Sequence, residues 1–387
     1  MLGKEAVMGK SLNGKELGNG ISQRKDGLYQ ARFTNRFGKR QTIYAKTLNE
    51  VRHKLRTEQY NDEKAINVVD TNMTLDEWFD IWLSTCKKNC RNSTKMLYIT
   101  HYKRIQGELG WRKLTSLNLI VMQEAFNKLK TDNTRKHSKT ILVDMLNKAV
   151  DADLLVKNVA KQINTVISKE EKKERRVLTV KETELFLEQA KGNFYENLFI
   201  LALETGLRVG ELSALQWEDV DFKNKVLHVR HTLCYFSKNG KYVFEMHDTK
   251  TNNGKRTIPL TAKAIHSLKC QRIQKQEIIL KGRTAEEEFQ NLVFVTRKNR
   301  PTKLGVINRC IHSVIQNINK AGIDFLPFTA HTFRHTFATR AIECGMNPKT
   351  LQKILGHGTL QMTMDLYCHV TEDTLFSEME KFEKWCS

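Results

Sequence analysis

Four segments in the second half of the chain combine arginine, lysine, histidine and tyrosine in a way that suits chemistry on a phosphate group. They read TGLRVGEL (205–212), DTKTNNGKRTIPL (248–260), HTFRHTF (331–337) and LGHGTLQMTMDLYCHV (355–370). Breaking a phosphodiester without a metal requires a nucleophile, donors for the two non-bridging oxygens and a proton for the departing 5′ oxygen. Arginine suits the oxygens because its planar fork binds phosphate bidentately and stays protonated. The segments contain candidates for all of these tasks.

A metal site is the first alternative, because His331 and His335 stand four residues apart, as two zinc ligands do on a helix. The motif that uses this spacing also needs a glutamate after the first histidine, and this chain has Thr332 there. A metal-dependent transposase would need three converging carboxylates, and no motif supplies them. We therefore predict no metal and no other cofactor.

Taken in order, the four segments resemble the catalytic motifs of the tyrosine recombinase (phage integrase) family. The resemblance rests on the succession Arg, Lys, His-x-x-Arg, His and Tyr, which would rarely arise by chance. It implies that Arg208 and Arg334 clamp the scissile phosphate from two separate helices. Glu211 stands three residues after Arg208 on the same helical turn, so we expect it to orient that guanidinium. Gly206 and Gly210 flank Arg208 and would allow backbone or phosphate to come close.

The resemblance assigns the general acid to Lys250, which would protonate the 5′-hydroxyl leaving group. Lys250 comes just before the turn at 252–254, which predicts a mobile hairpin tip that can reach DNA. Lys255 and Arg256 follow on the same loop and remain rivals for this role. Their alternative role is contact with the DNA backbone.

The remaining implied site residues are two histidines and a tyrosine. By resemblance, His331 is an acid or base hydrogen-bonded to the phosphate, and His357 bonds a non-bridging oxygen, while His335 is expected to be structural. Tyr367 is the implied nucleophile, and its attack would give a 3′-phosphotyrosine that a second strand's 5′-hydroxyl reseals. A tyrosine beside Leu366 is usually a core residue, so this assignment depends on the motifs that precede it.

Composition favours a polyanionic partner over a small metabolite. With 64 Lys and Arg against 43 Asp and Glu, the formal net charge is +21, which favours nucleic acid before membrane. The longest apolar run, 198–203, is far too short to span a bilayer. The basic, Gly-rich N-terminus lacks a secretory signal, and the 8 Cys show no disulfide framework. We expect a protein of the bacterial cytoplasm, associated with the nucleoid.

The N-terminal part is predicted to be a flexible leader over 1–19 and a small domain over 20–70. Alternation through 28–34 and 41–45 indicates two or three strands, and Thr47 begins a helix. The exposed strand face would carry Arg24, Lys25, Arg32, Arg36, Lys39 and Arg40, with Tyr29 and Tyr44 between them. A basic ribbon in a DNA groove is the favoured interpretation. A solvated sheet face with tyrosines in the core remains the alternative.

The middle of the chain, 73–165, has helical periodicity throughout. Thr74 and Glu77 form a capping-box pattern, and apolar residues recur at helical spacing in four segments. Cations near the start of this bundle are candidate DNA contacts: Lys87, Lys88, Arg91 and Lys95. A charge-dense linker is predicted at 166–176, a catalytic domain that mixes helices with strands at 177–371, and an apolar helical tail at 372–387.

The fold class that follows is a multidomain, mainly α chain with small β-sheets. It comprises a three-stranded sheet with a helix, a helical-bundle (SAM-like) core-binding domain and a mixed α+β catalytic domain. The layout further resembles integrases of conjugative transposons and temperate phages. This implies double-stranded DNA partners with core and arm sites, a homotetramer on DNA, an accessory DNA-bending or excisionase protein, and integration and excision of a mobile element. A catalytically inactive DNA-binding regulator and a type IB topoisomerase are the alternatives.

Overall fold

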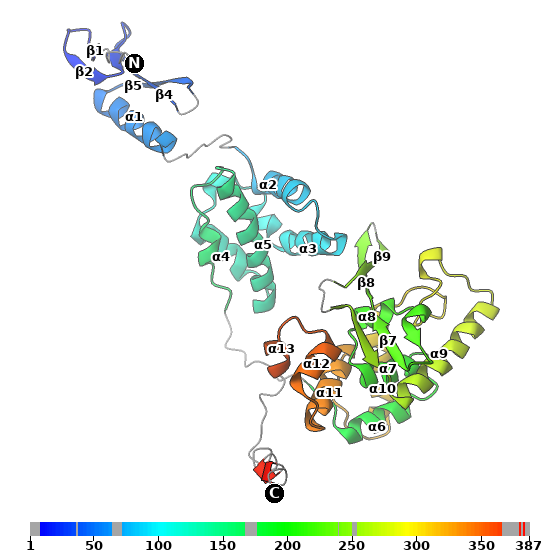
Figure 1. Ribbon diagram of the computed structural model, residues 1–387. Helices are drawn as coiled ribbons and strands as arrows, with labels where there is room; N and C mark the ends of the chain where they lie inside the picture. The colour runs from blue at the N-terminus through cyan, green and yellow to red at the C-terminus, as the bar shows by residue number, and fades with distance from the viewer. Residues whose placement is uncertain are drawn as a thin grey trace. The chain divides into compact units, whose positions relative to one another are not determined.

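The computed structural model describes residues 8–35, 38–63, 72–166, 176–238, 240–249, 254–365, 379–380 and 382–383. The chain divides into two compact units, residues 1–170 and 171–387. The prediction of a mainly helical chain with small antiparallel sheets is confirmed (Figure 1).

The first unit begins with two small antiparallel sheets. Its elements are β1 (Met8–Lys10), β2 (Glu16–Asn19), β3 (Ile21–Gln23), β4 (Tyr29–Thr34), β5 (Arg40–Ala45) and α1 (Leu48–Glu63). Strands β1 and β2 form a hairpin, and the second sheet has the order β3-β4-β5. Helix α1 packs on β4 and β5, where Val51 and Leu55 cover Ala31 and Ala45. The predicted three-stranded sheet with a following helix is confirmed.

The flexible leader predicted over 1–19 is wrong for residues 8–19. Leu17 is only 2% exposed and belongs to the core of the sheet. A Cβ built at Gly9 would meet the carbonyl oxygen of Ile21 at 1.6 Å, so only glycine allows this contact. Short strands rich in glycine lack an alternating apolar pattern, so periodicity does not reveal them. Residues 1–7 lie outside the described residues.

The rest of the first unit is a helical bundle. Its elements are α2 (Leu75–Ile81), the π-helical turn η1 (Trp82–Cys86), α3 (Asn92–Leu109), η2 (Leu114–Ser116), α4 (Leu119–Asn127), α5 (Asp132–Asp151) and η3 (Val159–Gln162). The predicted capping box is present, because Thr74 accepts from the Glu77 amide and Glu77 accepts from the Thr74 amide. The predicted aromatic face is the core: Trp82 is fully buried, and Phe79 stacks on Tyr102 with ring centroids 3.8 Å apart.

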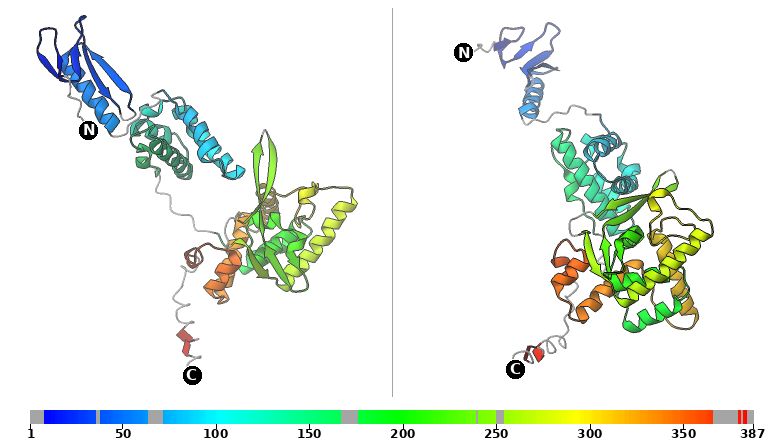
Figure 2. Two further views of the ribbon diagram at one scale, coloured as in Figure 1. Left: turned by 45° about the horizontal axis from the view of Figure 1, so that its top comes forward. Right: turned by 45° about the vertical axis from the view of Figure 1, so that its right-hand side comes forward.

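The second unit mixes ten described helical segments with five strands. They are α6 (Val180–Gln189), α7 (Glu196–Thr205), α8 (Val209–Ala214), η4 (Trp217–Asp219), β6 (Val220–Asp221), β7 (Val226–Val229), β8 (His231–Lys238), β9 (Lys241–Asp248), β10 (Arg256–Pro259), α9 (Ala262–Leu280), η6 (Glu287–Phe289), α10 (Leu304–Lys320), α11 (Ala330–Glu343), α12 (Pro348–Leu355) and α13 (Gln361–Met364). One sheet has the order β10-β7-β6, and β8 pairs with β9 in a separate hairpin that projects from the domain (Figure 2).

Helices α7 and α11 pack together in the centre of this unit. Their contact is built from Phe199 and Phe333, whose ring centroids are 5.6 Å apart, and Phe186 of α6 lies against both. All of these side chains are at most 1% exposed. Burying an aromatic side chain of this kind stabilises a fold by about 1.5–3 kcal/mol. The core thereby fixes the two segments that carry Arg208 and Arg334 against each other.

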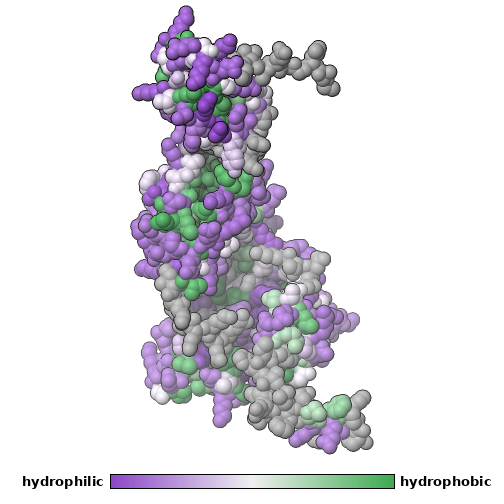
Figure 3. Space-filling model, turned by 90° about the vertical axis from the view of Figure 1, so that its left-hand side faces the viewer, coloured by the Kyte–Doolittle hydropathy of each residue, from purple (hydrophilic) through white to green (hydrophobic). Residues whose placement is uncertain are grey.

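The surface agrees with the high charge of the chain. The face in Figure 3 is mostly hydrophilic, with separate hydrophobic areas. No helix among the described residues has the length and apolar character needed to cross a membrane.

Candidate active site

The C-terminus of α12 gathers three arginine side chains from distant parts of the second unit. The Nε of Arg256 donates a hydrogen bond of 2.6 Å to the carbonyl of Ile354. The Nη2 of Arg334 donates to the next carbonyl, that of Leu355, at 2.8 Å. The Nη2 of Arg208 donates to the carbonyl of Gly356 at 3.2 Å. The last carbonyls of a helix have no partner within the helix and carry its partial negative charge. Three consecutive carbonyls therefore hold three guanidinium groups next to one another.

Two glycines at helix ends make this gathering possible. Gly206 ends α7 with φ 62° and Gly356 ends α12 with φ 64°, both in the left-handed region. A Cβ at Gly206 would also meet Phe337 at 2.4 Å and Leu355 at 3.0 Å. The Gly206 carbonyl accepts a hydrogen bond of 2.8 Å from Nη1 of Arg334. The close approach that the sequence suggested at this glycine is thus made by protein side chains.

Glu211 lies between two of the three arginines. It accepts from Nη1 of Arg208 at 2.9 Å, and from Nη1 and Nη2 of Arg256 at 3.1 and 2.8 Å. Burial by itself would raise the pKa of Glu211, but the neighbouring charges of Arg256 and Arg208 outweigh it and hold the pKa below its ordinary value. The carboxylate therefore stays ionised and fixes both guanidinium groups.

A cavity of about 490 Å³ opens beside these groups. Its lining includes Arg208, His331, Arg334, His335 and His357. The rings of His331 and His335 meet edge to face with centroids 4.6 Å apart. Four of the six predicted catalytic residues are thus brought to one cavity, and His335, which the sequence assigned to structure, also lines it.

His357 is buried next to this cluster of positive charge. It is 7% exposed, and its Nδ1 lies 2.9 Å from Oγ1 of Thr363. Burial, followed by the charges of Arg334 and Arg208, lowers the pKa of His357 to about 4. Burial also lowers the pKa of Arg334, with Arg208 adding to the effect. Positive charges thus lie close together where little water can solvate them. A bound phosphate would stabilise these charges.

Lys250 and Tyr367, the other two predicted catalytic residues, lie outside the described residues. Their nearest described neighbours in sequence are Thr249 and Asp365, and Asp365 lines the cavity. Of the rivals to Lys250, Lys255 forms an exposed ion pair of 2.6 Å with Asp248.

Arg256 is a site residue whose contacts sequence reasoning did not foresee, although it was considered as a rival to Lys250. Its side chain is only 6% exposed and, unlike the similarly buried Arg334, it is not among the described residues that line the cavity. Its guanidinium instead bonds Glu211 and the Ile354 carbonyl, which suits neither the general-acid role nor the DNA-backbone contact considered from the sequence. The only sequence signal was its position at the start of a strand after a turn, because its partner Glu211 is distant in the chain.

Comparison with known proteins connects this arrangement to one family. Residues 176–374, which hold all of the site described above, match the model of the Phage integrase family. The chain belongs to the phage integrase family. Residues 10–64 match a second model, described as the DNA binding domain of Tn916 integrase.

Relatives of this integrase-family chain cover nearly its whole length. It is 29% identical to the transposase from transposon Tn916 of Enterococcus faecalis, with 96% of each chain covered. It is 31% identical to a XerC-like tyrosine recombinase of Caldanaerobacter subterraneus subsp. tengcongensis, covering 86% of this chain and 88% of the relative. A solved Tn1549 transposon integrase in complex with a circular intermediate DNA matches with a TM-score of 0.68 and 26% identity, covering 80% of this chain and 99% of that one. The prediction of a tyrosine-type site-specific recombinase is confirmed.

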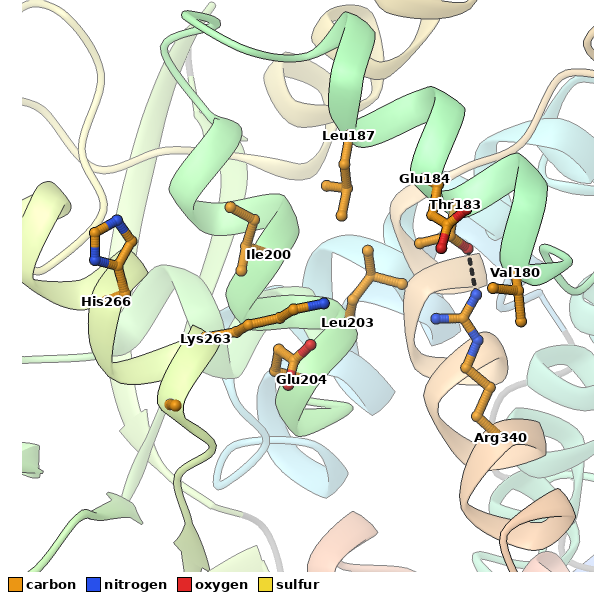
Figure 4. A pocket seen from close by; sticks show the side chains of 11 residues that line it. Val180, Thr183, Glu184, Leu187, Ile200, Leu203, Glu204, Lys263, His266 and Arg340 are labelled. Atoms are coloured by element: carbon orange, nitrogen blue, oxygen red, sulfur yellow. Dashed lines mark hydrogen bonds between the residues drawn. The ribbon is translucent and has the colours of Figure 1, made fainter.

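A second cavity in this integrase domain, of about 580 Å³, is lined by α6, α7, α9 and α11 (Figure 4). Its lining combines apolar residues such as Leu187 and Leu203 with Glu184 and Lys263, and it shares no residue with the first cavity. At its edge, Nη2 of Arg340 donates to Oγ1 of Thr183 at 2.6 Å. Arg340 is therefore an arginine of the same domain that bonds protein groups away from the candidate site.

The N-terminal sheet of this integrase-family chain has one basic face and one core face. Arg32 and Arg40 are exposed, and their cross-strand partners Thr42 and Thr34 are exposed on the same face. Tyr44 shares that face at 47% exposure, with the guanidinium of Arg24 5.5 Å from its ring centroid. Tyr29 instead packs against the core. The two tyrosines were predicted to lie together between the cations. The structure separates them, because Tyr29 pairs with Ala45, and Ala45 and its neighbour Tyr44 face opposite sides of the sheet.

The other predicted DNA contacts of the first unit differ in accessibility. Lys25 and Lys39 are exposed, while Arg36 lies outside the described residues. In the helical bundle, Lys88 is exposed, Arg91 and Lys95 are partly buried, and Lys95 donates to the Lys88 carbonyl at 2.8 Å. Lys87 forms an ion pair of 2.7 Å with Asp144 and lies over the ring of Trp82. Lys87 is thus engaged by protein groups, and the exposed Lys25, Lys39 and Lys88 are the better candidates.

Proposed function

We propose that this chain cuts and rejoins DNA strands through a 3′-phosphotyrosine on Tyr367, and so integrates and excises a mobile element. The observation that carries the proposal is the convergence of Arg208, Arg334 and two histidines on one cavity. Glu211 is shared by Arg208 and Arg256, while Arg334 donates to the carbonyls of Gly206 and Leu355. The guanidinium groups thus outnumber the carboxylates that bond them, which leaves positive charge for a phosphate to neutralise.

Arg208 and Arg334 would hold the non-bridging oxygens of the scissile phosphate. A guanidinium has five N–H donors. Among the described residues, Arg334 gives one hydrogen bond to each of two carbonyl groups, and Arg208 gives one to a carbonyl and one to Glu211. Both side chains therefore keep donors for a ligand while their positions are fixed by the protein. Such preorganised donors lower the barrier because they need not reorganise as negative charge develops.

The reaction then needs an attacking group and an acid. The Tyr367 hydroxyl gives its proton to a base at the phosphate, for which His331 is the candidate, as its oxygen attacks phosphorus and forms the tyrosine–phosphate bond, and the bond from phosphorus to the 5′ oxygen breaks. Lys250 gives its proton to that oxygen, and His331 assists as acid or base at the phosphate. In the reverse direction a 5′-hydroxyl of a second strand attacks phosphorus and releases Tyr367. The exchange conserves the number of phosphodiester bonds, so no external energy source is needed.

His357 would bond a non-bridging oxygen in its neutral form. Its low pKa keeps the ring uncharged near neutral pH. When the Thr363 hydroxyl donates to Nδ1, the proton of the ring lies on Nε2, which is then a donor for the phosphate.

The partners follow from the same proposal. The small domain within 20–70 would bind arm sites, the bundle within 73–165 and the catalytic domain within 177–371 would bind core sites, and 166–176 would link them. Exchanging both strands of two duplexes takes four cleavages, which suits a homotetramer on DNA. The reaction would take place in the cytoplasm, with an accessory DNA-bending or excisionase protein. The tail, 372–387, would dock on a neighbouring protomer. Two of its apolar residues, Met379 and Phe382, are 65% and 60% exposed, as an unoccupied docking segment would be.

The test is covalent trapping in the presence of a chelator. Fragments tiled across the DNA that flanks the gene are nicked, incubated with the full chain and analysed for a protein–DNA adduct. Wild type should form the adduct without magnesium, and Tyr367→Phe should not. An adduct that persists in Tyr367→Phe would contradict the nucleophile, and a protein that binds DNA without any adduct would be a regulator. Relaxation of supercoiled DNA without strand exchange would indicate a topoisomerase.

A further inference from the structure

Arg256 connects three segments around the candidate site. Its guanidinium donates to the Ile354 carbonyl at the end of α12, to both carboxylate oxygens of Glu211 on α8, and at 3.2 Å to the Gly254 carbonyl. Its own backbone belongs to β10. Gly254 is the first described residue after Lys250 in the sequence. One side chain thus joins the helix that bears Glu211, the helix end that precedes His357 and the end of the Lys250 segment.

The contacts of Glu211 show what this connection does. A carboxylate has about four acceptor positions, and Glu211 accepts four hydrogen bonds. Two come from Arg256, and two from the side chain and the backbone amide of Arg208. The side chain of Glu211 is only 4% exposed, so water could not replace the partners that its carboxylate would lose without the two Arg256 hydrogen bonds. The nearest remaining cation is Arg208, so the carboxylate would turn toward it and draw its guanidinium from the phosphate.

A lysine could not replace this fork. Its ammonium is a point charge, and it cannot bond a carboxylate bidentately while also reaching the carbonyls of Ile354 and Gly254. The positive charge would be kept, but the geometry that divides Glu211 between two arginines would be lost.

We propose that Arg256 is a positioning residue for strand cleavage, which sets the Arg208 guanidinium through Glu211 and fixes the end of α12 without touching DNA. The proposal rests on the proposed function, because cleavage is the step that it affects. It separates Arg256 from the exposed cations of the same domain, whose contribution would be to DNA affinity.

The test compares Arg256→Lys with Arg340→Lys, a control in which the same substitution is made at an arginine whose Nη2 donates to two protein acceptors away from the site. The probe is the nicked duplex fragment that wild type cleaves. Arg256→Lys should bind this duplex as wild type does at the same salt concentration but form the adduct about 10²-fold more slowly in a single turnover. Arg340→Lys should cleave at the wild-type rate. Melting temperatures of both variants report any loss of folding.

A double-mutant cycle tests whether Arg256 acts through Glu211. In a Glu211→Gln background, Arg256→Lys should slow cleavage much less than in wild type. Additive losses, a loss of DNA affinity with an unchanged cleavage rate, or equal slowing in Arg340→Lys would each overturn the positioning role. A wild-type protein that forms no adduct would overturn the proposed function and this inference together. Normal cleavage by Arg256→Lys would overturn this inference alone.

Discussion

Arg208 and Arg334 donate to adjacent carbonyl groups of one helix end, Gly356 at 3.2 Å and Leu355 at 2.8 Å, although they come from different segments. The geometry fixes the distance between the two guanidinium groups before any ligand binds. Arg334 is 5% exposed, whereas the side chain of Arg208 is 39% exposed. Arg334 is therefore held mainly by protein, and Arg208 is the more accessible member of the pair.

This difference predicts the behaviour of Arg208→Lys. Lysine keeps the charge but loses the bidentate fork. We expect the variant to bind the core-site duplex normally and to lose about 10²- to 10³-fold in the single-turnover rate of adduct formation. Gel-shift titration and quenched cleavage on the same duplex measure the two effects. Abolished binding, or an unchanged rate, would contradict the role given to Arg208.

Gly206→Ala should destabilise the fold through both conformation and contact. The left-handed backbone costs a non-glycine residue about 1–2 kcal/mol, and crowding of Phe337 and Leu355 adds about 1–3 kcal/mol. Gly282→Ala is the matched control, because Gly282 has φ 71° and a Cβ placed there would meet nothing within 4 Å. Denaturant unfolding of the full chain should show the larger loss for Gly206→Ala. Equal losses would mean that the contact with Phe337 has no energetic effect.

Stability should depend on pH through His357. Its folded pKa of about 4 lies below the ordinary value of 6.5. As pH falls through this window, the unfolded chain takes up a proton that the folded chain does not, so the free energy of unfolding decreases. His357→Gln should make the free energy of unfolding less dependent on pH between about 6.5 and 4. Denaturant unfolding at several pH values measures this, with His312→Gln as the control for removing an exposed histidine. If the free energy of unfolding of His357→Gln depended on pH as steeply as that of wild type, the lowered pKa of His357 would be contradicted.

The exposed sheet face of the N-terminal domain should act separately from cleavage. Arg32→Ala and Arg40→Ala should each weaken binding to an arm sequence and lower the salt slope by about 1 per lost phosphate contact. Lys54→Ala, which removes a cation paired with Glu50 on α1, serves as the control. Deleting residues 1–70 should remove arm binding and leave cleavage of short core duplexes intact. A truncated chain that cannot cleave them would contradict the modular arrangement.

The tail is expected to act between protomers. Deleting the residues after Asp373 should spare binding to a single core site but lower cooperative assembly of two sites, because the apolar residues of the tail would no longer reach their docking surface. Native gels of paired duplexes and recombination assays measure this. Unfolding of the truncated chain, or recombination at the wild-type rate, would rule out docking between protomers.

Local patterns in the sequence determined the fold class, the family and most of the site. The capping box at Thr74 needs only neighbours along the chain, so its geometry follows from spacing alone. The order of Arg208, His331, Arg334 and His357 likewise identified residues that the fold brings to one cavity. These inferences succeed because each depends on residue type and short-range spacing.

The tertiary structure alone decided which partners these residues have. The bond between Arg256 and Glu211 joins a strand to a distant helix, and the carbonyls that hold the arginines belong to the end of α12. The Gly-rich hairpin of 8–19 and the opposite facing of Tyr29 and Tyr44 depend equally on pairing between strands. Such contacts arise from packing of distant segments around shared cores. Residue spacing does not predict these contacts, because they are stabilised by burial and hydrogen bonding between segments that are distant in the sequence.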